Sequence, residues 1–202
     1  MLKNLINIFS PMLISMSPIK KYLEAYSRKS FRILYYHYVG NNVPDYYFKG
    51  KGITHSEFLR QVEYFRNRYE IISLKDAIER TEEKQSLQNC LTITTDDGFS
   101  SNYHTIAPIL DEFNLTAEFF ITTNFINNAD LMWRNKLCAI TNNCDSSEIK
   151  SIMIELSRIY DIPQSKNNIQ GGLINWSNSW DMNYKDRFAK KAWDLSSLEP
   201  LD

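Results

Sequence analysis

Hydrophobic and polar positions follow two alternating periods between residues 31 and 126. Short apolar and β-branched runs bounded by turn residues predict strands, at 31–39, 70–74, 90–95 and 116–122. Between these runs, apolar positions at helical spacing predict helices, at 55–69, 74–80 and 100–113. The first run, FRILYYHYV, is apolar almost throughout and is therefore expected to be a buried strand. Strands that alternate with helices predict an α/β fold with a parallel sheet or barrel of βα units.

Polar residues at the helix boundaries support these elements. Thr54 and Glu57 form a capping-box pattern, and Ser73 is an N-cap for the following short helix. Pro108 is expected to restart the helix at 100–113, because proline is tolerated in a first turn and disruptive deeper inside.

The chain changes character after residue 126. Helices are predicted at 135–142, 146–160 and 183–195, a loop is predicted at 161–180, and no strand pattern follows residue 125. At the other end, Ser17 and Pro18 resemble a helix start, while the apolar stretch 5–16 is too short and too broken to span a bilayer. The expected division is an N-terminal helical segment at 1–30, a βα region at 31–126 and a mostly helical segment at 127–202.

Composition and charge exclude several classes of function. The 202 residues carry 23 basic and 24 acidic side chains, so no field of one sign attracts nucleic acid or an anionic membrane. Three cysteines without a short CxxC pair argue against a disulfide framework and a thiolate zinc site. The three histidines, His37, His55 and His104, form no HxxxH pair.

Asp96, Asp97 and Gly98 are the strongest candidate for chemistry, because they directly follow the predicted strand CLTITT. Repulsion between two adjacent carboxylates raises the free energy of the doubly ionised state, and a divalent cation relieves it. Gly98 permits a sharp turn, and active sites of α/β barrels collect at such strand ends. The alternative interpretation is a surface turn, which an Asp-Asp-Gly triplet also favours.

Several segments together resemble the NodB-like polysaccharide deacetylases. They are LTITTDDGF at 91–99, SNYHTIAPIL at 101–110 and TAEFFITTNFI at 116–126, with YYHYV at 35–39, 53–78 and LMWRNKL at 131–137 around them. Thr95 departs from the pattern, since the family usually has phenylalanine there. The resemblance implies a partial, distorted (β/α) barrel of the deacetylase type, followed by a mostly helical insertion.

The resemblance also implies roles for the two carboxylates. Asp96 matches the general base that activates water, and Asp97 matches a ligand of a divalent metal, usually zinc. Family members take two further ligands from a later His-x-x-x-His segment, and the chain contains no histidine after His104. A catalytic zinc normally has three protein ligands. We therefore expect an N-terminal portion of a deacetylase, weakly active or inactive alone.

Other residues are candidates for contacts around this site. His37 ends the strand expected beside that of Asp96, so it is a candidate substrate or supporting contact. Trp133 and Arg134 are candidates for lining a sugar groove, with the alternative that Trp133 packs the helical insertion onto the barrel. His55 and His104 are expected to be solvent-facing helical residues.

The predicted function is metal-dependent deacetylation of N-acetylated or O-acetylated sugars in a surface polysaccharide or its precursor. The partner is then an acetylated oligo- or polysaccharide, with no nucleic acid, and open barrel edges favour self-association. A non-catalytic, carbohydrate-binding remnant is the alternative. A phosphotransferase is weaker, because the DxDxT pattern is absent. Without a clear signal peptide or membrane span, the expected location is cytoplasmic or membrane-peripheral.

Overall fold

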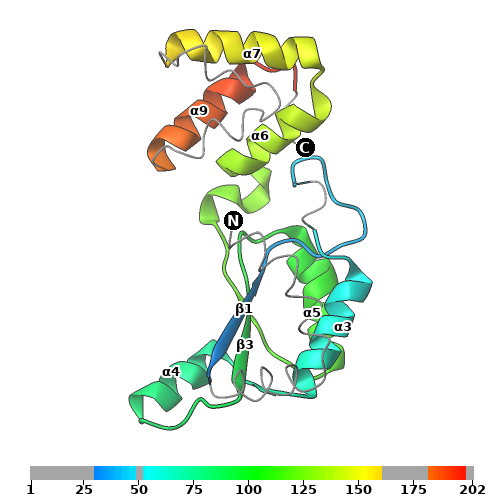
Figure 1. Ribbon diagram of the computed structural model, residues 1–202, viewed down its shortest axis with the longest axis vertical. Coiled ribbons are helices and arrows are strands. Elements are labelled where there is room, and N and C mark those ends of the chain that lie inside the picture. Colours follow the sequence, from blue (N-terminus) through cyan, green and yellow to red (C-terminus); the bar gives the residue numbers. More distant parts are fainter. Residues whose placement is uncertain (1–29, 49–51, 161–181, 199–202) are drawn as a thin grey trace, which may run out of the picture. The chain divides into compact units, whose positions relative to one another are not determined.

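The computed structural model describes residues 30–48, 52–160 and 182–198 (Figure 1). The chain divides into two compact units, one of residues 1–39 and 54–121 and one of residues 40–53 and 122–202. In chain order the elements are β1 (Arg32–Tyr36), α3 (His55–Arg66), β2 (Glu70–Ile71), α4 (Leu74–Glu82), β3 (Cys90–Thr95), η1 (Asn102–Ile106), α5 (Ala107–Glu112), β4 (Glu118–Phe119), η2 (Thr123–Asn128), α6 (Trp133–Asn143), α7 (Ser146–Ile159) and α9 (Met182–Asp194). The helix start predicted at Ser17 and the loop predicted at 161–180 lie outside the described residues.

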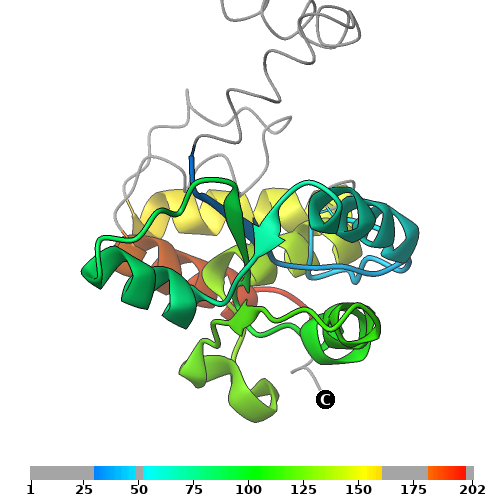
Figure 2. The same ribbon diagram turned by 90° about the horizontal axis from the view of Figure 1, so that it is seen from below.

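Strand β3 is the centre of a parallel sheet in the first unit. It pairs with β1 along 91–95, while β2 pairs with its first two residues and β4 with its last two. All six residues of β3 are buried. The alternation of strand and helix therefore gives the parallel α/β arrangement that the sequence predicts, and Figure 2 shows α3 and α5 on the same side of the strands.

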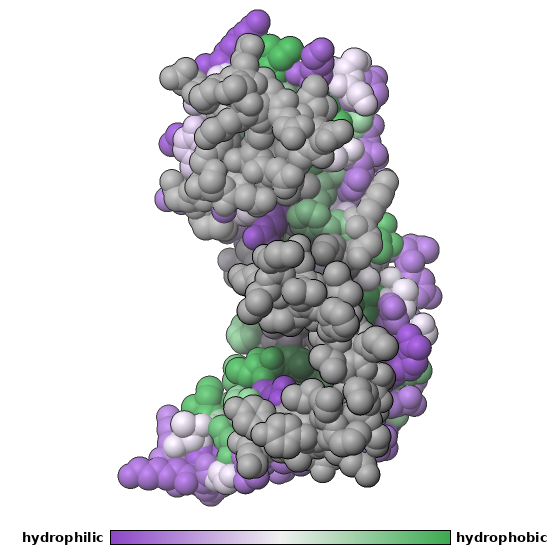
Figure 3. Space-filling view, viewed as in Figure 1, coloured by the Kyte–Doolittle hydropathy of each residue, from purple (hydrophilic) through white to green (hydrophobic). Residues whose placement is uncertain are grey.

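Strand β1 differs from the prediction, because it is shorter and only half buried. Its side chains alternate, with Tyr36 6% exposed and Tyr35 70% exposed. Tyr36 packs edge-on against Phe58 of α3 and its hydroxyl donates to Gln61, whereas Ile33 and Tyr35 face away from that helix. The unbroken apolar run predicted burial on both faces of the strand, but only the face that carries Tyr36 is buried. Hydrophobic side chains also reach the surface in Figure 3.

The predicted helix caps of the first unit are confirmed. The Thr54 hydroxyl accepts from the Glu57 backbone N–H, and the Glu57 carboxylate accepts from the Thr54 N–H at 2.9 Å. This pairing lowers the pKa of Glu57. Helix α3 then buries Phe58 and Val62 completely or almost completely, at 0% and 1% exposure. Ser73 caps α4 through the Asp76 backbone N–H at 3.0 Å.

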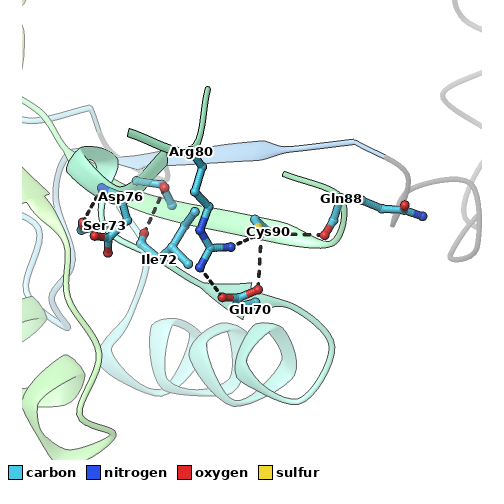
Figure 4. A network of polar contacts seen from close by, with 8 residues as sticks. Glu70, Ile72, Ser73, Asp76, Arg80, Gln88 and Cys90 are labelled. Carbon is cyan, nitrogen blue, oxygen red and sulfur yellow. Dashed lines mark hydrogen bonds and ion pairs between the residues drawn. The ribbon is translucent and has the colours of Figure 1, made fainter. Parts of the chain in front are cut away.

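A polar network fastens α4 to the beginning of β3 (Figure 4). Arg80 donates to the Glu70 carboxylate at 2.6 Å and to Cys90 Sγ at 3.4 Å. The hydrogen bond from Arg80 lowers the pKa of Glu70, and burial raises the pKa of the Cys90 thiol. This cluster lies at the N-terminal end of β3, away from Asp96, so its role is to hold the elements together.

The helix predicted at 100–113 begins with a π-helical turn, η1, and continues as α5. Pro108 lies in the first turn of α5, as predicted. An unbroken α-helix would set the proline ring against the carbonyl of residue 104 and leave that carbonyl without a donor. The wider turn, closed by the Ala107 N–H on the Asn102 carbonyl, avoids this conflict.

The second unit contains the helices α6, α7 and α9 and has a core of its own. Asp145 caps α7 by accepting from the backbone N–H groups of Ser147 and Glu148. The core is formed by buried residues of α6, α7 and α9, namely Trp133, Leu137, Ile140, Ile152, Met153, Leu156, Phe188, Ala189 and Ala192. No helix within the described residues is long and apolar enough to cross a membrane.

Candidate active site

The site is built at the carboxyl end of β3, where the buried strand ends and two carboxylates follow. The backbone N–H of Asp96 donates to the Tyr36 carbonyl at 2.8 Å, which continues the pairing of β1 with β3 by one residue. On the other side, the Phe120 N–H donates to the Thr95 carbonyl at 2.8 Å. The peptide group that joins Thr95 to Asp96 is therefore held from both sides, at the carboxyl end of the central strand.

The backbone turns sharply directly after Asp96. Asp97 and Gly98 both have a φ of 72°, in the left-handed region. At Gly98 the positive φ favours glycine, and a Cβ atom would lie 3.1 Å from Ile121 Cγ2, which would then have to shift. At Asp97 the same φ is unfavourable, and aspartate is among the few non-glycine residues that adopt it. The turn presents two consecutive carboxylates at the strand end at a conformational cost.

This geometry predicts how the fold responds to changes at Asp97. Asp97→Gly and Asp97→Asn are expected to leave the free energy of unfolding unchanged or raised, because both residues accept a positive φ. Asp97→Ala is expected to lower it by about 1 kcal/mol, since alanine does not. Denaturant unfolding of the three variants measures the difference. Equal stability of the alanine and glycine variants would contradict the conformational argument.

His37 lies beside Asp96 because of the strand register. Tyr36 is paired with Thr95 in the sheet, so the next residues, His37 and Asp96, leave the sheet together. His37 Nδ1 is 3.8 Å from Asp96 Oδ2, too long for a hydrogen bond but within reach of charge attraction when the imidazole is protonated. The two side chains are 35% and 38% exposed, so water has access to both.

The other predicted residues belong to other elements than the strand ends that carry His37 and Asp96. His104 is exposed on η1, where its ring contacts Tyr103 edge-on at 5.1 Å, and His55 is exposed at the start of α3. Trp133 and Arg134 belong to the second unit. There Trp133 is 3% exposed in the helical core, with Arg134 and Lys185 over its ring. A role of these two residues toward a sugar stays a prediction.

The metal site predicted at Asp97 requires further ligands near this carboxylate. Among the residues that the structure describes, no group of three histidine, cysteine, aspartate or glutamate side chains converges as metal ligands do. Asp97 is one carboxylate, and a catalytic zinc needs about three protein ligands. The described residues alone therefore do not fit a complete metal centre.

Sequence reasoning missed two residues next to the site. Ser101 and Asn102 are 6% and 5% exposed; Ser101 Oγ accepts from the Val39 N–H beyond β1, and Asn102 Nδ2 donates to Thr95 at the end of β3. Helical spacing gave no signal for them, because a polar residue at a helix start is normally assigned to solvent. Asn102 lies close to Thr95, seven residues earlier, only because the chain turns back at Gly98.

Comparisons with known proteins agree with the sequence resemblance. The family model of polysaccharide deacetylase matches residues 83–155. No curated protein gives a significant match.

Similar solved structures include three bacterial proteins. A de-N-acetylase from Aggregatibacter actinomycetemcomitans is 20% identical, with 53% of this chain and 49% of that chain covered and a TM-score of 0.42. IcaB from Ammonifex degensii is 19% identical, with 56% and 49% covered and a TM-score of 0.44. The Streptococcus pyogenes deacetylase PplD in complex with acetate is 16% identical, with 82% and 80% covered and a TM-score of 0.42.

The chain spans about half of the length of the first two structures, at 49% each. All three TM-scores are low, so the likeness to the family rests on the sequence match alone. The matched segment contains strand β3, both carboxylates of the turn and the helices that follow. Residues 83–155 of the chain thus match the polysaccharide deacetylase family model.

Proposed function

We propose that the chain takes part in removing acetyl groups from N-acetylated or O-acetylated sugars of a surface polysaccharide or its precursor. The observation that carries the proposal is the pair Asp96 and Asp97 at the carboxyl end of β3, inside the family segment and beside His37. The proposed scaffold is a distorted (β/α) barrel, of which the parallel sheet around β3 is a part.

In this proposal Asp96 is the general base. Its carboxylate is partly exposed, and its backbone is fixed by the Tyr36 carbonyl, so it is able to hold a water molecule in a constant position. It takes a proton from that water as the oxygen bonds to the acetyl carbon. The bond from this carbon to the sugar nitrogen then breaks as the nitrogen takes up the proton that Asp96 holds, which releases acetic acid and leaves a free amine on the sugar. His37 is proposed to contact the carboxylate or the substrate at this point.

Asp97 is proposed as one ligand of a divalent metal such as zinc. When bound, such a metal supplies polarisation of the acetyl carbonyl. Since the described residues do not form a complete ligand set, the 202-residue chain is expected to bind zinc weakly and to be weakly active by itself.

Titration calorimetry with Zn²⁺ and with an N-acetylated chito-oligosaccharide tests this function. Sugar binding that weakens in Asp96→Asn, or that strengthens when zinc is present, supports a deacetylase site. The second candidate is a non-catalytic carbohydrate-binding protein on the same scaffold, which the incomplete ligand set favours. Sugar binding that is indifferent both to Asp96→Asn and to zinc would support this second function and contradict the first.

Self-association is a further proposal, based on the exposed face of β1. Within the described residues β1 pairs only with β3, and Ile33 and Tyr35 are 52% and 70% exposed. Exposed apolar edge strands invite pairing with another chain, and charged residues oppose it. Tyr35→Lys is therefore expected to shift the chain toward the monomer in light scattering after size exclusion. The exposed Ile78→Lys on α4 is the matched control, and an equal shift in both variants would contradict a specific role of β1.

A further inference from the structure

Asn102 is a buried amide that reaches the strand end carrying the two carboxylates. It is 5% exposed, and its Nδ2 donates to Thr95 Oγ1 at 3.0 Å. Thr95 is fully buried at 0% exposure and directly precedes Asp96. The bond therefore joins the first residue of η1 to the last residue of β3. A displacement of Thr95 at the end of β3 would stretch this bond.

The neighbouring residue makes a similar contact to the other strand. The Val39 N–H donates to Ser101 Oγ at 3.4 Å, and Val39 is two residues beyond His37. Two consecutive side chains thus contact the segment that follows β1, which carries His37, and the last residue of β3, which directly precedes Asp96. The Ser101 bond is long and weaker, so Asn102 provides the firmer of the two contacts.

The backbone of Asn102 is fixed on both sides. Its N–H donates to the Phe99 carbonyl at 2.8 Å, and its carbonyl accepts from the Ala107 N–H to close the π-helical turn. Single π-helical turns are rare and are often found at functional sites. The backbone that carries the Asn102 side chain is consequently held in a fixed position.

Packing alone does not explain an amide at this position. Among the described residues, no protein atom bonds the buried Asn102 Oδ1. A buried polar atom without a partner is unfavourable, and an apolar side chain would fill the same space without it. The bond to Thr95 is the contact that an apolar residue would lack.

We propose that Asn102 is a positioning residue for Asp96 and acts through the Thr95 hydroxyl. Its consequence for turnover rests on the proposed deacetylase function, whereas the positioning itself is a property of the fold. Asn102 can position Asp96 only if residue 95 carries a hydroxyl that accepts its hydrogen bond.

Amide hydrogen exchange in the full 202-residue chain tests the positioning without an activity assay. The reporter is the Asp96 N–H, which bonds the Tyr36 carbonyl, and the reference is the Val62 N–H inside α3. Thr95→Val keeps the shape and removes the hydroxyl, so it should speed exchange at Asp96 about tenfold relative to Val62, from the loss of one buried hydrogen bond. Thr95→Ser keeps the hydroxyl and should change this ratio by less than about threefold, as expected for a small packing change.

Thr92→Val is the matched control, because it removes a buried hydroxyl from the same strand, which donates to the Ile72 carbonyl. It should speed both amides equally. An unchanged ratio in Thr95→Val, or a ratio in Thr95→Ser as large as in Thr95→Val, would overturn the proposal.

The unaltered chain provides a second measurement if Thr95→Val does not fold. The side-chain NH₂ of Asn102 should exchange far more slowly than that of the exposed Asn67. Equal exchange of the two amides would refute the proposed contact. Both exchange measurements are independent of deacetylation. A negative result in them therefore refutes the positioning and not the proposed function, whereas an absence of turnover refutes the proposed function and not the positioning.

Discussion

Asp96→Asn is expected to lower acetate release from an N-acetylated chito-oligosaccharide by at least about 100-fold, the smaller end of the range for loss of a general base. The asparagine amide has nearly the shape of the carboxylate and does not accept the proton of water. The backbone bond to Tyr36 is kept, so the fold should be unchanged. Because the starting rate of this chain is itself expected to be low, the measurement needs concentrated protein and added Zn²⁺.

Asp111→Asn is the control for this experiment. Asp111 is also in the first unit and is exposed on α5, so its loss removes the same charge away from the turn. It should keep the full rate. An Asp96→Asn variant that retains more than about a third of the rate would rule out Asp96 as the base, since a lost general base costs far more than that.

The elements that the sequence predicts well are those fixed by neighbouring residues. The capping box at Thr54, the cap at Ser73 and the helix restart at Pro108 depend on contacts within one turn, and each is present. The β3 strand at Cys90–Thr95 was also predicted with its observed bounds, because a β-branched run ended by Asp-Asp-Gly leaves little choice.

The features that the sequence did not predict depend on distant parts of the chain. Which strands flank β3, and that β1 buries only one side, follow from contacts between residues some sixty positions apart, such as Leu34 and Thr94. The hydrogen bond from Asn102 to Thr95 likewise forms only because the chain turns at Gly98 between the two residues. The family model, the pattern of residues at 91–110 and the position of β3 agree, whereas the roles of Asp96, Asp97 and His37 stay predictions.

The surroundings of Lys136 were also not predicted from the sequence, which only places this residue on a helix. Its side chain is only 7% exposed, and Nζ lies 2.7 Å from Asp130 Oδ1. The same oxygen accepts from the Leu131 N–H at 2.7 Å, so one carboxylate holds both the start of α6 and a buried ammonium group. Asp130 itself is about half exposed, at 49%.

Asp130→Ala is therefore expected to lower the free energy of unfolding by about 2–3 kcal/mol, below the range for a fully buried pair because water reaches the aspartate. The cost arises because the variant leaves an ammonium group buried without its partner. Denaturant unfolding followed by circular dichroism measures it. Glu155→Ala is the matched control, since its pair with Arg158 is exposed and should contribute less than about 1 kcal/mol. Equal costs in the two variants would contradict a buried charge at Lys136.

Replacing the lysine should have the opposite outcome. Lys136→Met removes the buried charge and keeps most of the apolar volume, so the free energy of unfolding should be unchanged or raised, because well-packed apolar residues often replace a buried pair without loss. Asp130 then turns to solvent, which its exposure permits. The difference in sign between Asp130→Ala and Lys136→Met separates the cost of an unpaired charge from the value of the pair. If both variants are destabilised alike, the ion pair itself stabilises the helical unit and the desolvation argument fails.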